Sequence, residues 1–165
     1  MASPRRTGTP ATAALSAARV PFVTHEYAHD PLTTHFGAET VAALGIEAAR
    51  VFKTLVVDLV GGGSPVVCAV VPVSGHLDLK ALAHAAGAKR ATMAEPAAAQ
   101  RLTGYVLGGI SPLGQRRQLP VYLDASARQF DAVVVSGGRR GLSVEVAPDD
   151  LASLLAATYA DLART

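Results

Sequence analysis

The sequence predicts an α+β fold in which a single domain is built around one mixed or largely antiparallel, barrel-like β-sheet flanked by helices. Three observations support this class. Runs of β-branched residues are joined by glycine-rich turns, which is typical of hairpins. Helix-start and helix-end residues bracket the segments between those runs. The chain has 165 residues, half of them hydrophobic, which is enough for one independent hydrophobic core.

The N-terminal part is expected to hold a helix, a strand and a second helix. Thr9 followed by Pro10 is a helix-start signal, so the first helix should run from there to about Arg19. Residues 22–27 alternate in polarity like a short strand. After a polar loop, a short helix should end at Gly45.

A hairpin should occupy the centre of the chain. Residues 51–60 are rich in β-branched side chains and form the most convincing strand. Residues 61–64 make a turn, and residues 65–73 return as a buried strand. That second strand holds Cys68, whose thiol we expect to be buried and inert.

Helices and strands alternate over the remainder. Asp78 should cap a helix that Gly87 ends, and Glu95-Pro96 opens another that reaches about Leu102. Three further strands are expected at residues 119–124, 132–136 and 142–146, the last two joined by the turn 137–141. A C-terminal helix should start near Pro148 and bury Leu151, Leu154, Leu155, Tyr159 and Leu162.

Composition excludes several classes of protein. Residues 1–8 are predicted to be a flexible tail before a single domain, residues 9–165. A formal net charge of +2 permits contact with a polyanion but is too small for a protein that coats DNA, so we expect no DNA partner. One cysteine allows no intrachain disulfide. The longest uncharged span, residues 59–77, is broken by glycines and prolines, so we expect a cytoplasmic protein with no membrane contact.

Lys53 is the most informative residue. On an extended strand it shares a face with apolar residues only, namely Val51, Leu55, Val57 and Leu59. An ammonium on such a face must be paired or must emerge into a cleft, because burying it bare is costly. The pattern therefore favours a functional lysine, while a lysine whose stem packs and whose head reaches water is the alternative.

A glycine-rich loop is the second candidate. Residues 108–114 read Gly-Gly-Ile-Ser-Pro-Leu-Gly, and such a loop can expose backbone N–H groups to a ligand. It is no P-loop, because no Gly-Lys-Ser/Thr follows. An ordinary structural loop is the alternative. Residues 61–63 lack the helix of a dinucleotide site and are expected to form a hairpin turn.

Hydrolase and metal chemistry are only weakly supported. Ser136 precedes Gly137-Gly138, but its surroundings do not match a Gly-x-Ser-x-Gly elbow, and no histidine is placed to activate it. His25, His29 and His35 lie near Asp30 without the His-Glu-x-x-His spacing of a zinc helix. The sequence therefore predicts neither a metal nor another cofactor.

Beyond the N-terminal tail, basic residues occur in three pairs, Lys89-Arg90, Arg116-Arg117 and Arg139-Arg140. Solvated surface charge is the default interpretation of any one pair. The last two pairs lie beside glycine-rich segments, so Arg116, Arg117, Arg139 and Arg140 are predicted to contact a phosphate backbone.

Five segments follow one another in a characteristic order: Tyr27-Ala28-His29-Asp30-Pro31, Val51-Phe52-Lys53-Thr54-Leu55, Gly75-His76-Leu77-Asp78-Leu79-Lys80, residues 104–114 and residues 135–142. Taken together, and in this order, these segments resemble the YbaK/EbsC family, the free-standing Cys-tRNA(Pro) deacylases related to the editing domain inserted in prolyl-tRNA synthetases. The resemblance implies that Lys53 is the catalytic residue. It implies a substrate-binding role for Tyr27, Phe36, Gly108, Gly109, Ile110, Ser111, Pro112 and Ser136. Ser143 departs from the family, which often has aspartate there.

The resemblance also implies an activity, the removal of cysteine from mischarged Cys-tRNA(Pro) and also from Cys-tRNA(Cys). In that family's model the substrate's own thiol attacks its ester and leaves as a thiolactone. The partners implied are the 3′ end of an aminoacylated tRNA and prolyl-tRNA synthetase. Two alternatives stay open: a deacylase for another small residue, such as Ala-tRNA(Pro), and a tRNA-binding module without turnover.

Overall fold

The computed structural model describes residues 8–165, so all but the last residue of the predicted tail lie outside the described residues. The described helices are α1 (Pro10–Ala17), α2 (Phe36–Leu44), α3 (Leu79–Ala85), α4 (Pro96–Thr103) and α5 (Pro148–Leu155), with 3₁₀ turns at Ala48–Arg50 and Ala125–Gln129. The strands are β1 (Phe22–Glu26), β2 (Phe52–Val60), β3 (Val66–Pro72), β4 (His76–Leu77), β5 (Arg90–Met93), β6 (Val121–Asp124), β7 (Val133–Arg139), β8 (Leu142–Val146), β9 (Thr158–Ala160) and β10 (Ala163–Arg164).

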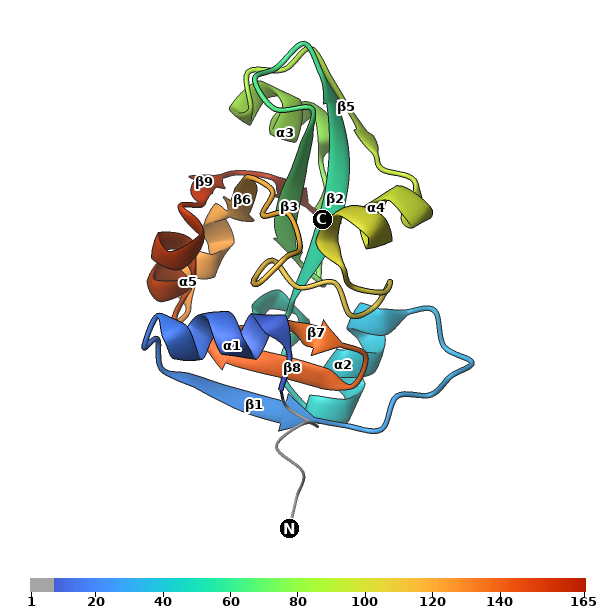
Figure 1. Cartoon of the computed structure of the whole chain (residues 1–165), viewed down its shortest axis with the longest axis vertical. Coiled ribbons are helices and arrows are strands. Elements are labelled where there is room, and N and C mark those ends of the chain that lie inside the picture. The colour runs from blue at the N-terminus through green and yellow to red at the C-terminus, as the bar shows by residue number, and fades with distance from the viewer. Residues whose placement is uncertain (1–7) are drawn as a thin grey trace.

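The strands form three sheets, which confirms the mixed α+β class (Figure 1). A five-stranded sheet has the order β5-β2-β3-β6-β9, a three-stranded sheet the order β1-β8-β7, and β10 pairs with β4. Pairing is antiparallel except for β3 with β6 and β6 with β9. The barrel-like expectation is wrong in one respect: within residues 8–165 the sheets do not close into a barrel, and one isolated bridge, Val51 to Val134, links the two larger ones.

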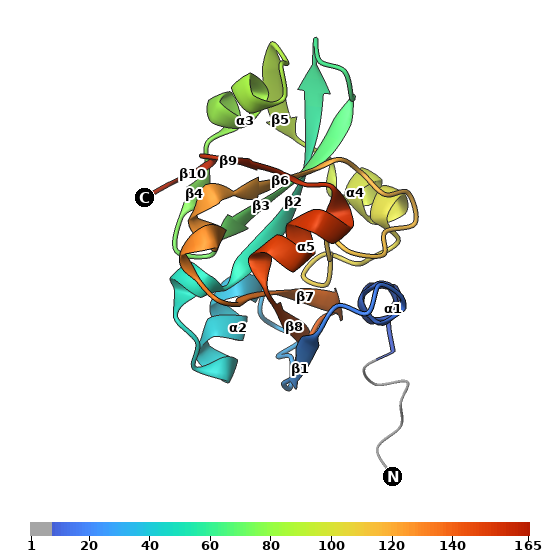
Figure 2. The same cartoon turned by 90° about the vertical axis from the view of Figure 1, so that its left-hand side faces the viewer.

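The core has two parts, one on each face of β2. Phe52 and Val56 pack in the first, together with α1, the loop before β6, and strands β7 and β8. Val57 and Leu59 pack in the second, against α3. Figure 2 shows α5 in the space between the two larger sheets. The alternation along β2 confirms that Lys53 projects on the same side as Leu55 and Val57.

The C-terminal segment differs most from the prediction. Helix α5 ends at Leu155 because Ala156 takes a left-handed conformation, with φ of 50°. Tyr159 therefore lies in β9 and not on the helix. Leu162 is fully buried as expected, but it lies in the segment between β9 and β10 and not on a helix. The backbone N–H groups of Leu162 and Ala163 both donate to Asp124 Oδ1.

Tertiary pairing also creates a strand that the sequence pattern did not reveal. Residues 90–93 form β5 because they pair with the edge of β2, from Val57–Met93 to Val60–Arg90. The helices are short, and α2 is the longest of those described, at nine residues. No described helix has the length and apolarity needed to cross a bilayer.

Candidate functional site

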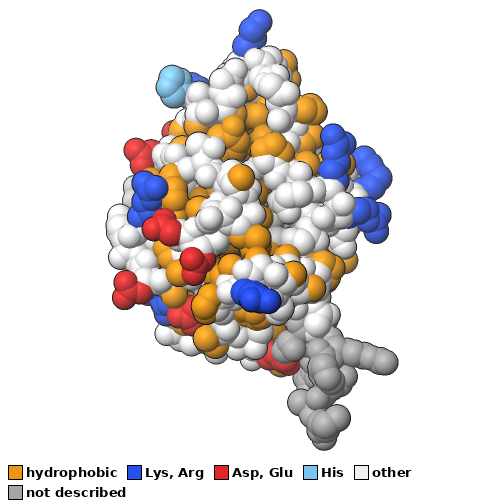
Figure 3. All heavy atoms as spheres, turned by 60° about the vertical axis from the view of Figure 1, so that its left-hand side comes forward, with side chains coloured by type: hydrophobic (Ala, Val, Ile, Leu, Met, Phe, Trp, Pro, Cys, Tyr) orange, Lys and Arg blue, Asp and Glu red, His pale blue; other side chains and the backbone are white. Residues whose placement is uncertain are grey.

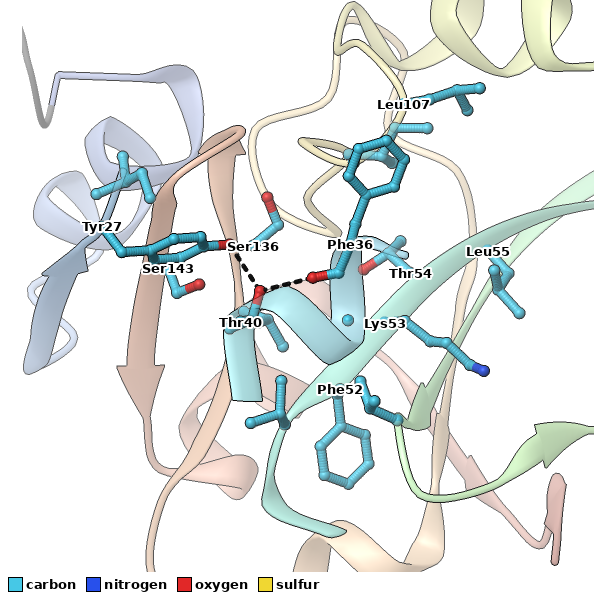
Figure 4. A pocket seen from close by; sticks show the side chains of 17 residues that line it. Tyr27, Phe36, Thr40, Phe52, Lys53, Thr54, Leu55, Leu107, Ser136 and Ser143 are labelled. Atoms are coloured by element: carbon cyan, nitrogen blue, oxygen red, sulfur yellow. Dashed lines mark hydrogen bonds between the residues drawn. The ribbon is translucent and has the colours of Figure 1, made fainter. Parts of the chain in front are cut away.

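A pocket of about 310 Å³ opens where β2 leaves the five-stranded sheet and approaches α2, β7 and β8 (Figure 4). This volume is at the lower end of the range for small-ligand sites. Six of the predicted site residues line it: Tyr27, Phe36, Lys53, Gly108, Ile110 and Ser136. Five separate segments of the chain contribute them, so the fold brings together residues as far apart in the sequence as Tyr27 and Ser136.

Phe36 forms one wall at the start of α2. Its ring lies directly against Gly108, where a Cβ atom would be 2.5 Å from the ring. Gly108 also has φ of +82°, a conformation that side chains rarely adopt, so two constraints require glycine there. The guanidinium of Arg140 lies 5.1 Å from the ring centroid, and its Nε donates to the carbonyl of Leu107 at 2.7 Å. A flat aromatic ring beside a cation is a suitable surface for a nucleobase.

Tyr27 closes the opposite side through a short hydrogen-bond chain. Thr40 donates its hydroxyl hydrogen to the carbonyl of Phe36 at 3.0 Å, and the hydroxyls of Tyr27 and Thr40 are 2.6 Å apart. Because the single hydrogen of Thr40 is used, the Tyr27 hydroxyl must be the donor of that second bond. The Tyr27 oxygen therefore presents lone pairs, and can accept a hydrogen bond from a ligand amine.

Lys53 lies at the edge of the pocket. Its stem lines the cavity, and its Nζ donates to the carbonyl of Gly75 at 3.0 Å. Figure 4 shows the ammonium directed away from Ser136 and Tyr27. Burial lowers the pKa of the Lys53 ammonium below its ordinary value. In this position the ammonium can meet an anionic group that enters along the rim, and it does not contact Ser136.

Thr54 is a polar residue of the pocket that the sequence reasoning missed. Its Oγ1 is buried and is the one described buried side-chain oxygen or nitrogen without a hydrogen-bond partner. A buried hydroxyl without a partner costs about 1–3 kcal/mol, so such an atom calls for an explanation. The available signal was the single hydroxyl of a mostly apolar strand, next to Lys53.

Two serines face each other on the neighbouring strands. Ser136 on β7 pairs with Ser143 on β8, and both line the pocket. The Ser136 hydroxyl accepts a hydrogen bond from the N–H of Gly138 at 3.2 Å. The residues that line the pocket include no histidine, cysteine, aspartate or glutamate. Within the described chain, the pocket therefore offers neither a base for Ser136 nor an acidic partner for a ligand amine.

Most residues of the glycine-rich loop pack behind the pocket wall, and only two of them line the cavity. Gly109, Ser111 and Pro112 are buried but do not line the cavity. The N–H of Gly109 donates to Val106, and the carbonyl of Ser111 accepts from the side chain of Gln115. A Cβ atom on Gly109 would be 2.8 Å from the backbone of Arg139. These residues hold the loop against β7, and Gly108 and Ile110 are the members that reach the cavity.

The four predicted arginine contacts divide into two groups. Arg140 reaches the pocket rim through Phe36 and Leu107, and Arg139 lies beside it, 3.7 Å from the carboxylate of Glu26. Arg116 and Arg117 are exposed and follow the C-terminal end of α4, where their N–H groups donate to Thr103 and Leu102. The structure therefore places Arg139 and Arg140 beside the pocket, whereas Arg116 and Arg117 lie against α4.

The other candidate groups have structural partners. His25 lies 2.8 Å from Glu145, and His29 lies 2.7 Å from Glu39, which fixes the loop before α2. Cys68 is fully buried as predicted, and burial raises the pKa of its thiol to about 11. In residues 8–165 no three His, Cys, Asp or Glu side chains are grouped so that they could hold a metal.

The fold and this pocket define the class of protein. The chain belongs to the aminoacyl-tRNA editing domain family, whose model matches residues 30–154. That stretch contains every pocket residue except Tyr27.

Individual relatives agree with the family. The chain is 42% identical over 145 residues to the Enterococcus faecalis protein named "Putative Cys-tRNA(Pro)/Cys-tRNA(Cys) deacylase EbsC", covering 87% of this chain and 86% of that one. It is 30% identical to the uncharacterized protein YwhH of Bacillus subtilis, over 76% of each chain. Its fold matches a crystal structure described as "a putative trans-editing enzyme for prolyl tRNA synthetase", with a TM-score of 0.80, 27% identity and full coverage of both chains.

Proposed function

We propose that this protein is a trans-editing deacylase that removes cysteine from mischarged Cys-tRNA(Pro), and also acts on Cys-tRNA(Cys). One observation carries the proposal: the pocket combines predicted substrate-binding residues with the absence, among its described lining residues, of any histidine, carboxylate or thiol that could start hydrolysis. The name of the Enterococcus faecalis relative supports the same substrate. A pocket of this kind suits a substrate that brings its own nucleophile.

The substrate's thiol supplies that nucleophile. An ordinary thiol has a pKa near 8.5, so a useful fraction is thiolate near neutral pH. The sulfur attacks the carbonyl carbon of its own ester, the bond from that carbon to the ribose oxygen breaks, and the ribose oxygen takes a proton. Intramolecular attack gains a large effective concentration, so the protein needs mainly to orient the ester and stabilise developing charge.

Several groups in and beside the pocket have roles in this scheme. Lys53 holds the terminal ribose–phosphate region at the rim, where its ammonium lies. Phe36 stacks with the terminal base beside Arg140. The Tyr27 oxygen accepts from the substrate amine, and the Thr54 hydroxyl finds its missing partner in the aminoacyl group. Backbone N–H groups near Ile110 are candidates for binding the developing oxyanion.

The need for such an enzyme follows from the limits of size discrimination. A synthetase pocket built for proline rejects a residue of similar size only about 10- to 200-fold. A second site that tests for a reactive thiol supplies the remaining discrimination against cysteine. In this role the protein works in the cytoplasm, with the 3′ end of an aminoacylated tRNA as its substrate and prolyl-tRNA synthetase as its partner.

The proposal is tested with two mischarged substrates, Cys-tRNA(Pro) and Ala-tRNA(Pro), each incubated with the purified protein. We expect rapid loss of cysteine and retention of alanine. Loss of alanine with retention of cysteine would instead identify a deacylase that uses water. If both stay attached, the protein is a tRNA-binding module without turnover. Lys53→Met is the matched inactive control, because it keeps the stem that packs in the pocket wall.

A further inference from the structure

A second cavity, of about 520 Å³, lies between α3 and β5, at the opposite end of β2 from the pocket. Its lining includes Lys80, His84, Lys89 and Arg90, over a floor of Ala83 and Ala91. The Lys89 stem rests on the β2–β3 turn, where a Cβ atom on Gly61 would be 2.8 Å from it. We refer to this cavity as the α3–β5 groove.

The α3–β5 groove carries positive charge without compensation. None of its lining residues is acidic. Lys80, Lys89 and Arg90 make no ion pair within the described part of the chain, and all three are exposed. The nearest carboxylate in sequence, Asp78, accepts the N–H groups of Lys80 and Ala81 as the cap of α3. Figure 3 shows Lys, Arg and His side chains at this upper end of the molecule.

The distance between the two sites calls for a long ligand. From Lys53 to Val60, β2 advances seven residues, about 23 Å at roughly 3.3 Å per residue. Val60 pairs with Arg90 and accepts the N–H of Lys89 at 2.8 Å, which fixes the groove at that end. The Debye length under physiological conditions is about 8 Å, so the groove's charge cannot act on the pocket through the solvent. A molecule that uses both sites must be a polymer that touches each of them.

The composition of the groove indicates how it would bind. Its apolar lining is alanine and Leu79, and it contains no Phe, Tyr or Trp, so it lacks the large aromatic anchor typical of a protein interface; His84 is the one ring among its lining residues. Lysine and arginine over an apolar floor suit phosphate oxygens, which give affinity without reading sequence.

We infer that the α3–β5 groove binds the sugar–phosphate backbone of the same tRNA whose aminoacylated end occupies the pocket, independently of nucleotide sequence. This rests on the proposed function for the identity of the RNA. Lys80 and Lys89 each neutralise one phosphate, and the RNA follows β2 from the pocket to the groove.

The test compares Lys80→Glu plus Lys89→Glu with a control that makes the same change in charge outside the groove and the pocket, at the exposed residues Arg19 and Arg101, Arg19→Glu plus Arg101→Glu. Binding of uncharged tRNA(Pro) and tRNA(Cys) is measured by fluorescence anisotropy over a range of salt concentrations. Loss of two phosphate contacts should weaken binding on the order of tenfold near physiological salt and reduce the log–log salt slope by about 1.4–1.8. The two tRNAs should be affected equally.

A second measurement separates this inference from the proposed function. Deacylation is compared on full-length Cys-tRNA(Pro) and on a cysteinylated CCA trinucleotide, which is too short to reach the groove. The loss of kcat/KM on the tRNA should exceed the loss on the trinucleotide by about tenfold. An unchanged affinity and salt slope, or equal losses of kcat/KM on the two substrates, would overturn the inference that the groove binds tRNA. If the native protein deacylates nothing but the binding changes appear, the groove stands and the deacylase proposal fails.

Discussion

The contact between Gly108 and Phe36 gives the sharpest prediction about the pocket. Replacing Gly108 with alanine would place a Cβ atom 2.5–2.7 Å from three ring atoms of Phe36. Carbon atoms normally approach to about 3.5 Å, so the ring must move by roughly 1 Å. A displacement of that size in a site that works by orientation can cost up to about a hundredfold in rate. Base stacking on an aromatic side chain is worth about 1–3 kcal/mol. We therefore expect Gly108→Ala to lower kcat/KM about tenfold to a hundredfold.

The control separates the clash from backbone strain. Gly45 ends α2, the helix that carries Phe36, and it has φ of +65° with open space where a Cβ atom would lie, since no neighbouring atom is within 4 Å. Gly45→Ala therefore carries the strain of a left-handed residue, about 1–2 kcal/mol, without the clash. It should lower the free energy of unfolding by that amount and leave kcat/KM within about twofold of the native value.

A double-mutant cycle tests whether the effect passes through the ring. If it does, Gly108→Ala should add little to Phe36→Ala, which gives a coupling energy of about 1–3 kcal/mol. Deacylation of Cys-tRNA(Pro) under single-turnover conditions is the assay. Additive losses, or a Gly45→Ala variant that is as slow as Gly108→Ala, would refute the reasoning.

Three further predictions concern single groups. Thr54→Val removes the unpartnered hydroxyl, so it should raise the free energy of unfolding by about 1 kcal/mol while lowering kcat/KM, as urea unfolding and deacylation together would show. With its pKa at about 11, Cys68 should react with a thiol reagent at pH 8 at least roughly a hundredfold more slowly in the native than in the unfolded protein. Hydrogen bonds from Arg50 and then His25 lower the pKa of Glu145, so its contribution to stability is present above the ordinary pKa near 4.5 and is lost as the pH falls through the lower native value. Glu145→Gln should therefore be less stable than the native protein at pH 7, and the difference should shrink in acid unfolding.

Much of the fold could be predicted because local patterns agreed with the tertiary structure. The β2–β3 hairpin follows from β-branched runs on either side of residues 61–64, and Phe52 to Asp58 pair with Pro72 to Val66 as expected. Alternation along β2 also placed Lys53 among apolar neighbours. The sequence could not reveal β5, β9 or β10, because these short strands exist only through pairing with β2, β6 and β4.

The candidate site was predictable in its members but not in its geometry. Residue type and the family resemblance identified Lys53, Phe36 and Gly108, which do line one pocket. The direction of the Lys53 ammonium toward Gly75, and the packing of Phe36 against Gly108, depend on contacts between distant segments that no local pattern encodes. Thr54 was missed for a related reason: a hydroxyl is notable only once its surroundings are known to lack a partner.

The most direct measurement uses a tRNA whose cysteine sulfur is blocked by a methyl group. The pocket residues are unchanged in that experiment, and only the nucleophile is removed from the substrate. If the cysteine thiol breaks its own ester, Cys-tRNA(Pro) should be deacylated and S-methylcysteinyl-tRNA(Pro) should remain intact at the same protein concentration. Deacylation of both at similar rates would contradict the account, because water would then be the attacking group.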